Sequence, residues 1–447
     1  MILSYAEGLG KVMQTAHESQ TRHRQIEYSP LEDALGRVAG KDVISPKSIP
    51  KYDTSAMDGY AICSEVTKNA SSQAPVLLEV LGTIAAGDDP EEVIKQVRAD
   101  PVSTTNHCLE IMTGAIFPDG YDACVKIEDT VPVNEHKGRS ILITKPVSWR
   151  ANRRLVGSDI LEGDVIIPQG KVVESSHILP LTSVGIDSVP ISRRPYVGVW
   201  STGKEMVNGR GATRDTNGPY LTAAVKEMGL HADFLGVLAD DPSALRDALQ
   251  NAANSAEFDV LITSGAVSKG KFDHIRGVLE QINAEIIFHG LGVRPGHPVL
   301  FALIPGASGK TAFFGLPGNP GASSACFRFL TVPYLRALQE QPVEQPMLAR
   351  LVRQPTTTKT KHGCHAMQDT DCFRHGVLSI TATGQLIVEP SSDQSPAKLG
   401  PFITANCWIH LRPHHSNAPA SFTGTDIVEC YPLSPMGTIR FATTFLN

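Results

Sequence analysis

The sequence predicts a multi-domain α/β plus β protein built around one doubly wound parallel sheet. Three observations lead to this prediction. The chain has 447 residues, enough for about three domains of roughly 150 residues each. Between residues 195 and 338, strand-like and helix-like segments alternate, as in parallel sheets with right-handed helical crossovers. Residues 51–146, and those after 343, instead contain short runs rich in β-branched side chains, separated by turn residues.

The elements before the alternating region are predicted from their local patterns. Residues 4–26 are expected to form a helix because apolar side chains recur on one face. A second short helix is expected over 29–39, where two carboxylates lie in the first turn and favour the positive end of the helix dipole. Residues 51–146 are expected to form a small β-rich module, and 158–170 a strand, a turn and a strand.

The alternating region predicts five strands and four helices. The predicted strands cover residues 195–200, 231–238, 258–263, 284–289 and 311–316. The predicted helices lie around 220–229, 242–256, 273–282 and 322–338. Ligands of doubly wound sheets bind beyond the carboxyl ends of the strands, so the loops at that edge are where a site is expected.

Charge and composition argue against several classes of protein. The chain has 40 Lys and Arg against 46 Asp and Glu, a net charge of −6, which argues against nucleic-acid binding as the main activity. No run approaches the ~18 apolar residues of a membrane span, and the first residues do not predict a secretory signal. The eight cysteines are dispersed without a CxxC pair, which favours the reduced cytoplasm over a disulfide framework.

Three loops at the predicted sheet edge are rich in glycine and small hydroxyl residues. They are Ser201–Glu205 with the nearby Asp215–Tyr220, Thr263–Asp273 and Gly315–Ser324. Such residues let backbone amides approach an anion, and helix N-termini add a favourable dipole. Each loop alone is more simply a turn or a helix cap. Three such loops at one edge make a site for a nucleotide-like or pterin-like anion about as probable as plain turns. Acids beside an anion site need a cation, typically Mg²⁺, and this edge carries Glu205, Asp215 and Asp273.

The β-rich module contains a further candidate. Asp58 lies in Thr54–Ile62, a stretch that otherwise has no charge, and a Thr-Gly turn follows in Ile111–Thr130. Taken alone, Asp58 is more simply a turn residue than a catalytic residue. The segment His362–His365 could hold a metal, but its spacing fits no standard zinc site, and loop residues exposed to solvent are the simpler interpretation.

In combination, these segments resemble the molybdopterin molybdotransferases, or molybdenum insertases, a family that includes the C-terminal domain of gephyrin. The matching strings, in family order over residues 29–320, are SPLEDALGRVA, TSAMDGYA, IMTGAIFPDGYDAC with EDT, RLVGSDILEGD, STGKE, DTN, TSGAVSKGKFD, PGHP and GLPGNP. The resemblance covers nearly the whole chain, and the combination of AMDGYA, MTGA and GLPGNP is specific.

The resemblance implies four domains and a reaction. The domains are an elongated dimerisation core (1–50 and 147–190), an inserted β-rich module (51–146), a doubly wound molybdopterin-binding domain (191–342) and a C-terminal β-barrel domain (343–447). The implied reaction inserts molybdenum from molybdate into adenylylated molybdopterin, releases AMP and uses Mg²⁺. The implied enzyme is a cytoplasmic homodimer whose active site lies between the molybdopterin-binding domain of one subunit and the β module of the other. A separate molybdopterin adenylyltransferase is its expected partner, with no nucleic acid and no membrane.

The resemblance also implies roles for residues at matching positions. The implied catalytic residues are Asp58, Asp159 and Asp273, with Asp273 and Asp58 holding the metal. The implied substrate-binding residues are Thr113, Gly114, Arg154, Ser201, Thr202, Gly203, Glu205, Asp215, Asn217, Ser264, Gly265, Pro317, Gly318 and Asn319. Arg294 and His297, in the loop GVRPGHP, are expected to contact the oxyanion.

The chain departs from the family pattern mainly on the side where the family binds molybdate. The departures are Ala266 for glycine, Lys271 for an acid, His297 for lysine, Ala322 for serine, and Pro396-Ala397-Lys398 for Ser-Ser-Arg. Two alternatives to a molybdenum insertase therefore remain. One is a paralogue with the same fold that acts on a different nucleotide-linked substrate, and the other is a non-catalytic dimeric scaffold. The retained acids Asp58, Asp159 and Asp273 favour catalysis.

Overall fold

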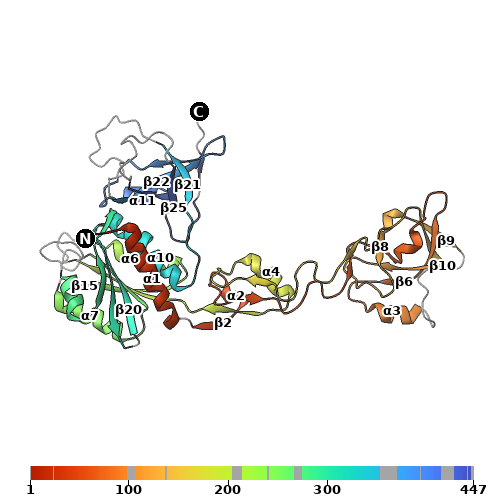
Figure 1. The fold of residues 1–447 in the computed structure, drawn as a ribbon, viewed down its shortest axis with the longest axis horizontal. Coiled ribbons are helices and arrows are strands. Elements are labelled where there is room, and N and C mark those ends of the chain that lie inside the picture. Colours follow the sequence, from red (N-terminus) through yellow and green to blue (C-terminus); the bar gives the residue numbers. More distant parts are fainter. Residues whose placement is uncertain are drawn as a thin grey trace. The chain divides into compact units, whose positions relative to one another are not determined.

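A computed structural model describes most of the chain (Figure 1). The described residues are 2–23, 25–97, 106–135, 138–203, 214–238, 241–265, 274–307, 309–352, 370–392, 394–413, 427–439 and 441–443. The chain forms two compact units. The first comprises Met1–Lys41, Gln169–Val173 and Pro190–Asn447, and the second comprises Asp42–Pro168 and Glu174–Val189. No helix in the described part of the chain is long and apolar enough to cross a membrane.

The first unit contains the predicted doubly wound sheet. Its six strands lie in the order β15-β14-β16-β20-β19-β17. Their bounds are Tyr196–Thr202 (β14), His231–Leu238 (β15), Val260–Ser264 (β16), Glu285–His289 (β17), Leu300–Gly306 (β19) and Gly309–Leu316 (β20). Strands β15, β14, β16 and β20 are parallel, whereas β19 runs antiparallel to both of its neighbours. Every residue of β16 is buried, as expected for a strand covered on both faces.

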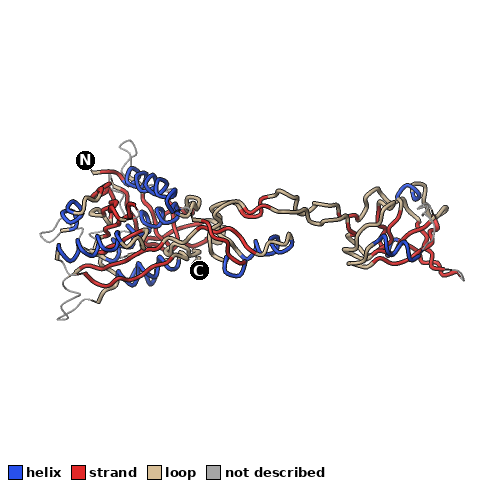
Figure 2. The backbone as a smooth tube through the Cα atoms, turned by 90° about the horizontal axis from the view of Figure 1, so that it is seen from below, coloured by secondary structure: helices blue, strands red, loops and turns tan. Residues whose placement is uncertain are grey.

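Helices cover both faces of this sheet (Figure 2). The helices are α1 (Tyr5–His23), α6 (Asn217–Glu227), α7 (Pro242–Asn254), α8 (Ile275–Gln281), α9 (Pro320–Cys326) and α10 (Val332–Leu338), with a π-helical segment at Phe327–Thr331. Apolar residues of α1, α6, α9 and α10 share one core with the sheet, and those of α7 and α8 share another. Asp241 is the N-cap residue of helix α7, because its carboxylate accepts a hydrogen bond from the Ala244 amide at 2.8 Å.

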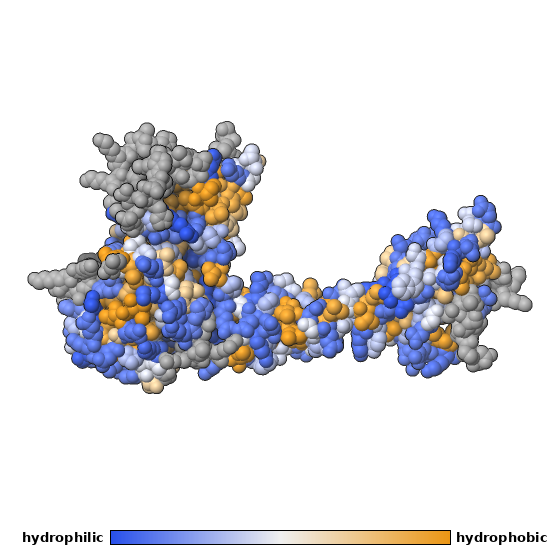
Figure 3. Space-filling model, viewed as in Figure 1, coloured by the Kyte–Doolittle hydropathy of each residue, from blue (hydrophilic) through white to orange (hydrophobic). Residues whose placement is uncertain are grey.

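A second sheet in the same unit forms the predicted C-terminal barrel. Its order is β1-β18-β22-β23-β21-β25-β24, and the additional β22–β24 pairing closes the ring. The bounds are Leu3–Ser4 (β1), Leu291–Arg294 (β18), Met347–Leu351 (β21), Asp371–Ile380 (β22), Leu386–Pro390 (β23), Cys407–Leu411 (β24), Ile427–Pro432 (β25) and Ala442–Thr443 (β26, beside β22), with helix α11 at Gly400–Thr404. The barrel core is apolar, and exposed apolar side chains also appear on its outer surface (Figure 3), where Leu348 and Ile427 are each 60% exposed.

The second unit is rich in short strands. A six-stranded sheet has the order β8-β5-β7-β6-β10-β9, and two ribbons pair β11 with β4 and β12 with β3. The strands are Val43–Ile44 (β3), Thr54–Ser55 (β4), Gly59–Ile62 (β5), Val76–Ile84 (β6), His107–Ile111 (β7), Ala123–Lys126 (β8), Thr130–Glu135 (β9), Gly138–Ile143 (β10), Arg153–Arg154 (β11) and Val165–Ile167 (β12). The helices are α3 (Pro90–Val97) and α4 (Ser175–Ser183), with single 3₁₀ turns at Ser64–Thr67 and Ile127–Asp129.

The predicted fold class is confirmed, and three local predictions need correction. Helix α2 covers only Leu31–Ala34, not 29–39, because Gly36 has a φ of 74° and the following residues form β-bridges. Strand β19 was expected as a loop, yet its apolar run forms a hairpin with β20. Strand β18 was also expected as a loop, and it joins the C-terminal sheet. Two further strands, β2 (Ile26–Pro30) and β13 (Ser188–Ser192), complete the described elements.

Candidate functional site

The register of the doubly wound sheet brings the three predicted loops to one edge. Ser201 at the end of β14 pairs with Ser264 at the end of β16, and Ser264 pairs with Leu316 at the end of β20. The three strands therefore end side by side, and the loops that follow them start from adjacent positions. All three residues at these strand ends are buried, so the edge is part of the packed sheet.

Asn217, the first residue of α6, links all three loops. Its side-chain amide donates to the Ser264 hydroxyl at 2.7 Å and to the Gly318 carbonyl at 2.8 Å. The Ser264 hydroxyl lies 3.3 Å from both the Pro317 carbonyl and the Ser323 hydroxyl. Because each of these polar groups has a partner, the bonds fix the start of α6 and the end of β16 relative to the segment after β20.

Asp215 caps α6 and leaves one oxygen for another partner. Its Oδ1 accepts hydrogen bonds from the amides of Asn217 and Gly218, both at 3.1 Å. Its Oδ2 and the hydroxyl of Ser201 are buried without a hydrogen-bond partner among the described residues. A Cβ on Gly218 would lie 2.6 Å from Asp215 Oδ2 and 2.8 Å from Ser201 Oγ, so both unpartnered atoms lie at the start of α6. Buried polar atoms without partners are costly unless a ligand or water satisfies them.

Two glycines at this edge differ in whether the fold would accept a side chain. Gly265 has a φ of 101°, and a Cβ there would lie 2.4 Å from Thr202 Oγ1, so no side chain fits. Gly318 is exposed, and a Cβ there would make only an ordinary contact of 3.7 Å with Gly265 Cα. The backbone thus requires Gly265, whereas at Gly318 the absence of a side chain leaves the approach to Gly265 open. Helix α9 starts directly after this loop, with Asn319 at its N-cap and Pro320 in its first turn.

In the second unit, Asp58 is held by the predicted Thr-Gly turn. Its Oδ1 accepts hydrogen bonds from the Thr113 amide at 2.7 Å and the Thr113 hydroxyl at 2.8 Å. These bonds, the amide first and then the hydroxyl, lower the pKa of the Asp58 carboxyl below its ordinary value. Gly114 completes the turn with a φ of 82°, and its amide donates to the Ser55 carbonyl at 2.8 Å. Asp58 is therefore a fixed, exposed and ionised carboxylate.

Arg154 and Asp159 form an ion pair on the same unit. Their side chains are 45% and 52% exposed, so both remain accessible to a ligand. Asp53, which the sequence did not single out, holds this segment in place. Its carboxylate accepts from Arg153 Nε at 2.8 Å and from the Val156 amide at 2.7 Å. The sequence feature that could have identified Asp53 is its position directly before the TSAMDGYA string.

Profiles of two known families match this chain. The profile described as "MoeA N-terminal region (domain I and II)" matches residues 3–185, and the one described as "Probable molybdopterin binding domain" matches residues 198–337. A molybdopterin molybdenumtransferase of Synechococcus elongatus is 30% identical over 420 residues, covering 92% of this chain and 96% of that protein. The corresponding protein of Haemophilus influenzae is 31% identical, covering 90% and 93%. The chain belongs to the molybdopterin molybdenumtransferase family.

Solved structures agree with this assignment. A molybdopterin biosynthesis MoeA protein from Pyrococcus horikosii shares 29% sequence identity and superposes with a TM-score of 0.71, covering 94% of this chain and 98% of that one. The resemblance inferred from the sequence motifs is thus confirmed.

Around α9 lie three positions that the sequence resemblance marked as departures, namely His297 through its neighbour Gly296, Ala322, and Pro396. A Cβ on Gly296, the neighbour of His297, would lie 2.3 Å from Cys326 Sγ and 3.7 Å from the Ala322 carbonyl oxygen. The Gly321 amide donates to the Pro396 carbonyl at 2.8 Å. The imidazole Nδ1 of His297 lies 2.7 Å from the Leu291 carbonyl oxygen, which orients the exposed ring. Arg294 ends β18 three residues earlier and is also exposed.

The remaining site predictions have different outcomes. Glu205 and Asp273 lie outside the described residues, as do Ala266, Lys271 and His362–His365. Thr202 donates to the Ser264 carbonyl at 3.2 Å, and the Gly203 amide donates to the Leu238 carbonyl at 3.5 Å, so both support the loop frame. Ser323, which the sequence did not single out as a site residue, contributes its hydroxyl to this frame. No group of three potential metal ligands occurs within the part of the chain that the structure describes.

Proposed function

We propose that the protein is a molybdenum insertase that transfers molybdenum from molybdate to adenylylated molybdopterin and releases AMP. The observation that carries this proposal is the interlocked edge of the doubly wound sheet, where Asn217 joins the loops after β16 and β20. Its backbone amides, hydroxyls and helix N-termini are donors suited to phosphate oxygens. Curated relatives that match over most of their length are named molybdopterin molybdenumtransferase.

We further propose that Mg²⁺ is the cofactor and that acids from both units bind it. Asp58 fits this role because both hydrogen bonds from Thr113 go to Oδ1, so that no described residue bonds Oδ2. Asp273, which follows β16 in the sequence, is the second proposed ligand. Bound Mg²⁺ would neutralise charge on the pyrophosphate oxygens as the bond to AMP breaks. Arg154, Asp159 and the unpartnered Asp215 Oδ2 would orient the substrate.

The direct test is reconstitution. Purified protein is incubated with adenylylated molybdopterin, molybdate and Mg²⁺, and active cofactor is assayed by activation of an apo-molybdoenzyme. We expect activation that requires all three components, with AMP released in proportion to the cofactor formed. AMP release without active cofactor would contradict molybdenum insertion. That result would favour the paralogue with a different nucleotide-linked substrate, which the changes at His297, Ala322 and Pro396 near α9 make the second candidate.

We also propose the four domains with the boundaries given above, a homodimer and a cytoplasmic location. In the proposed homodimer, Asp58 of one subunit and Asp273 of the other serve one active site. Mixing Asp58→Asn with Asp273→Asn chains should then restore part of the activity that each variant lacks. A monomer with full activity in analytical ultracentrifugation would refute this arrangement. A separate molybdopterin adenylyltransferase would supply the substrate, and no nucleic acid or membrane takes part.

A further inference from the structure

The first unit contains a cavity of about 460 Å³ that shares no lining residue with the loops at the sheet edge. It lies between the start of α1, the helical residues 328–337, the segment 341–344 and strands β22, β24 and β25. Its volume falls within the range of roughly 300–1,000 Å³ that is typical of small-molecule sites. The proposed reaction assigns no role to it.

The walls of this cavity are mainly apolar. Leu9 and Met13 come from α1, Pro333 and Ala337 from α10, and Val343 from the segment that follows. Val343 is 69% exposed, so the cavity opens to solvent on its side. The aromatic ring of Phe329, which stacks on Phe373 at 3.9 Å between centroids, gives the cavity a rigid wall. Such walls suit an aromatic or branched aliphatic group.

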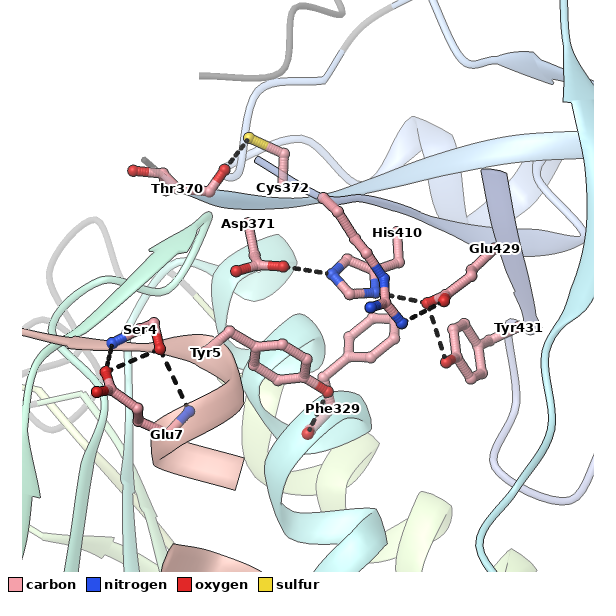
Figure 4. A network of polar contacts seen from close by, with 11 residues as sticks. Ser4, Tyr5, Glu7, Phe329, Thr370, Asp371, Cys372, His410, Glu429 and Tyr431 are labelled. Atoms are coloured by element: carbon pink, nitrogen blue, oxygen red, sulfur yellow. Dashed lines mark hydrogen bonds and ion pairs between the residues drawn. The ribbon is translucent and has the colours of Figure 1, made fainter. Parts of the chain in front are cut away.

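The polar groups of the C-terminal sheet that reach the cavity already satisfy one another (Figure 4). The imidazole of His410 lies between two carboxylates, with Nε2 at 2.7 Å from Asp371 and Nδ1 at 2.9 Å from Glu429. Arg412 donates to the other oxygen of Glu429 at 2.5 Å. Tyr431 donates to Glu429 at 3.4 Å. On this side of the cavity, each of these charged groups therefore already has a polar partner.

The two arginines of the helical wall differ from each other. Arg328 forms an ion pair with Glu344 at 2.7 Å and also donates to the Pro432 carbonyl. Arg336 donates only to the Pro342 carbonyl, at 3.0 Å, and forms no ion pair with any described carboxylate. Its Nε is buried without a hydrogen-bond partner among the described residues. The charge of Arg336 is poorly hydrated, and this desolvation lowers its pKa. The desolvation outweighs the attraction of Glu344, which raises the pKa.

We propose that this cavity binds a small amphipathic monocarboxylate, with the carboxylate on Arg336 and the apolar group against Leu9, Met13 and Pro333. A single negative charge matches the single cation that lacks a carboxylate partner in the described lining. A dianion such as a phosphate monoester fits less well, because Glu344 and Asp371 line the same cavity and would repel the second charge. This inference does not depend on the proposed insertase reaction.

The test compares 4-phenylbutyrate with its neutral amide, 4-phenylbutyramide, by ligand-observed NMR titration of the full chain. A ligand of this size should bind with a Kd of about 0.1–1 mM. Loss of one charge-assisted hydrogen bond should weaken binding by about 10- to 100-fold, so the amide should bind that much more weakly than the acid. Arg336→Gln should reduce the affinity for the acid to that for the amide.

Two variants complete the design. Met13→Trp fills the apolar end of the cavity and should abolish binding of both compounds. If Arg336→Gln fails to fold, this variant still tests whether the compounds bind in the cavity. Arg246 is a half-buried arginine of α7 that pairs with Asp247 outside the cavity, so Arg246→Gln should change neither affinity. Equal affinities for acid and amide, full acid binding by folded Arg336→Gln, or binding that survives Met13→Trp would overturn the proposal.

Discussion

The sheet edge of the first unit and the acidic surface of the second hold their polar groups in opposite ways. At the sheet edge, Ser201, Ser264 and Ser323 are at most 2% exposed, and most contacts are neutral hydrogen bonds between loops. On the second unit, Arg154 and Asp159 are about half exposed, and the carboxylate of the exposed Asp58 is held by the amide and hydroxyl of Thr113.

This difference separates stability from reactivity. Breaking a buried hydrogen bond leaves an unsatisfied group and costs about 1–3 kcal/mol, so the sheet edge should resist rearrangement. An exposed ion pair contributes only about 0–1 kcal/mol, so the acids of the second unit should be replaceable with little loss of stability. The first region is thus a rigid frame of buried hydrogen bonds, and the second presents charge at an accessible surface.

The largest expected effect is that of Gly318→Val on ligand binding. The new side chain has room, because a Cβ at Gly318 meets only Gly265 Cα at 3.7 Å, so the fold should be retained. It would cover the approach to the loop amides and should weaken binding of adenylylated molybdopterin by on the order of 100-fold, about 3 kcal/mol. Calorimetry measures the affinity. Gly400→Val is the matched control, since a Cβ at this exposed glycine meets nothing within 4 Å. Unchanged affinity in Gly318→Val would remove this loop from the site.

Asn217→Ala should reduce both stability and binding, because it removes the amide that joins two loops. Two lost hydrogen bonds, one of them to the Ser264 hydroxyl at 2.7 Å, should cost about 1–3 kcal/mol in the free energy of unfolding. Ligand affinity should fall by about tenfold as the loops lose their fixed spacing. Asn254→Ala, at an exposed position of α7, should change neither quantity. Wild-type stability in Asn217→Ala, measured by urea unfolding, would show that the frame does not depend on this residue.

On the second unit, Thr113→Val should change ionisation and leave stability nearly unchanged. Thr113 lowers the pKa of Asp58 through an amide and a hydroxyl bond, and the substitution removes the hydroxyl bond, so the pKa should rise toward the ordinary value of 3.8. Because the folded-state pKa is lowered, this interaction stabilises the fold above the unfolded-state pKa, and the stabilisation is lost as pH falls through the folded-state value.

NMR titration of the Asp58 carboxyl carbon measures this shift. Thr130→Val is the matched control, since the Thr130 hydroxyl donates to the Ile127 carbonyl and not to Asp58. An Asp58 pKa that is the same in Thr113→Val and in the wild type would assign the effect to the Thr113 amide alone.

The sequence predicts the strands and loops that form the candidate site better than it predicts the contacts between segments far apart in the chain. The strands and the glycine-rich loops that follow them are encoded locally, by runs of apolar residues and by turn residues, so their meeting at one edge follows from sheet geometry. The contact of Pro396 with the start of α9 is not encoded locally, because its carbonyl meets the Gly321 amide from about 75 residues later in the chain. Strand β19 was missed because an apolar run beside Gly and Pro fits a loop or a hairpin equally well before its partner is known.

The smallest expected effect concerns His297 at the substituted end of the frame. The Leu291 carbonyl oxygen, 2.7 Å from Nδ1, accepts a hydrogen bond when Nδ1 carries a proton, so Nε2 is the ring nitrogen left for a ligand. If His297 contacts molybdate, protonated Nε2 donates to the dianion, whereas the neutral ring presents a lone pair to it. Molybdate affinity should therefore fall by about three- to tenfold from pH 6 to pH 8. His297→Lys should flatten this profile, and His297→Ala should weaken binding at pH 6 only. His231→Gln, at an exposed histidine of β15, should keep the wild-type slope. A flat wild-type profile would exclude His297 as a charged contact and leave Arg294, which is charged throughout this range, as the candidate cation of the loop.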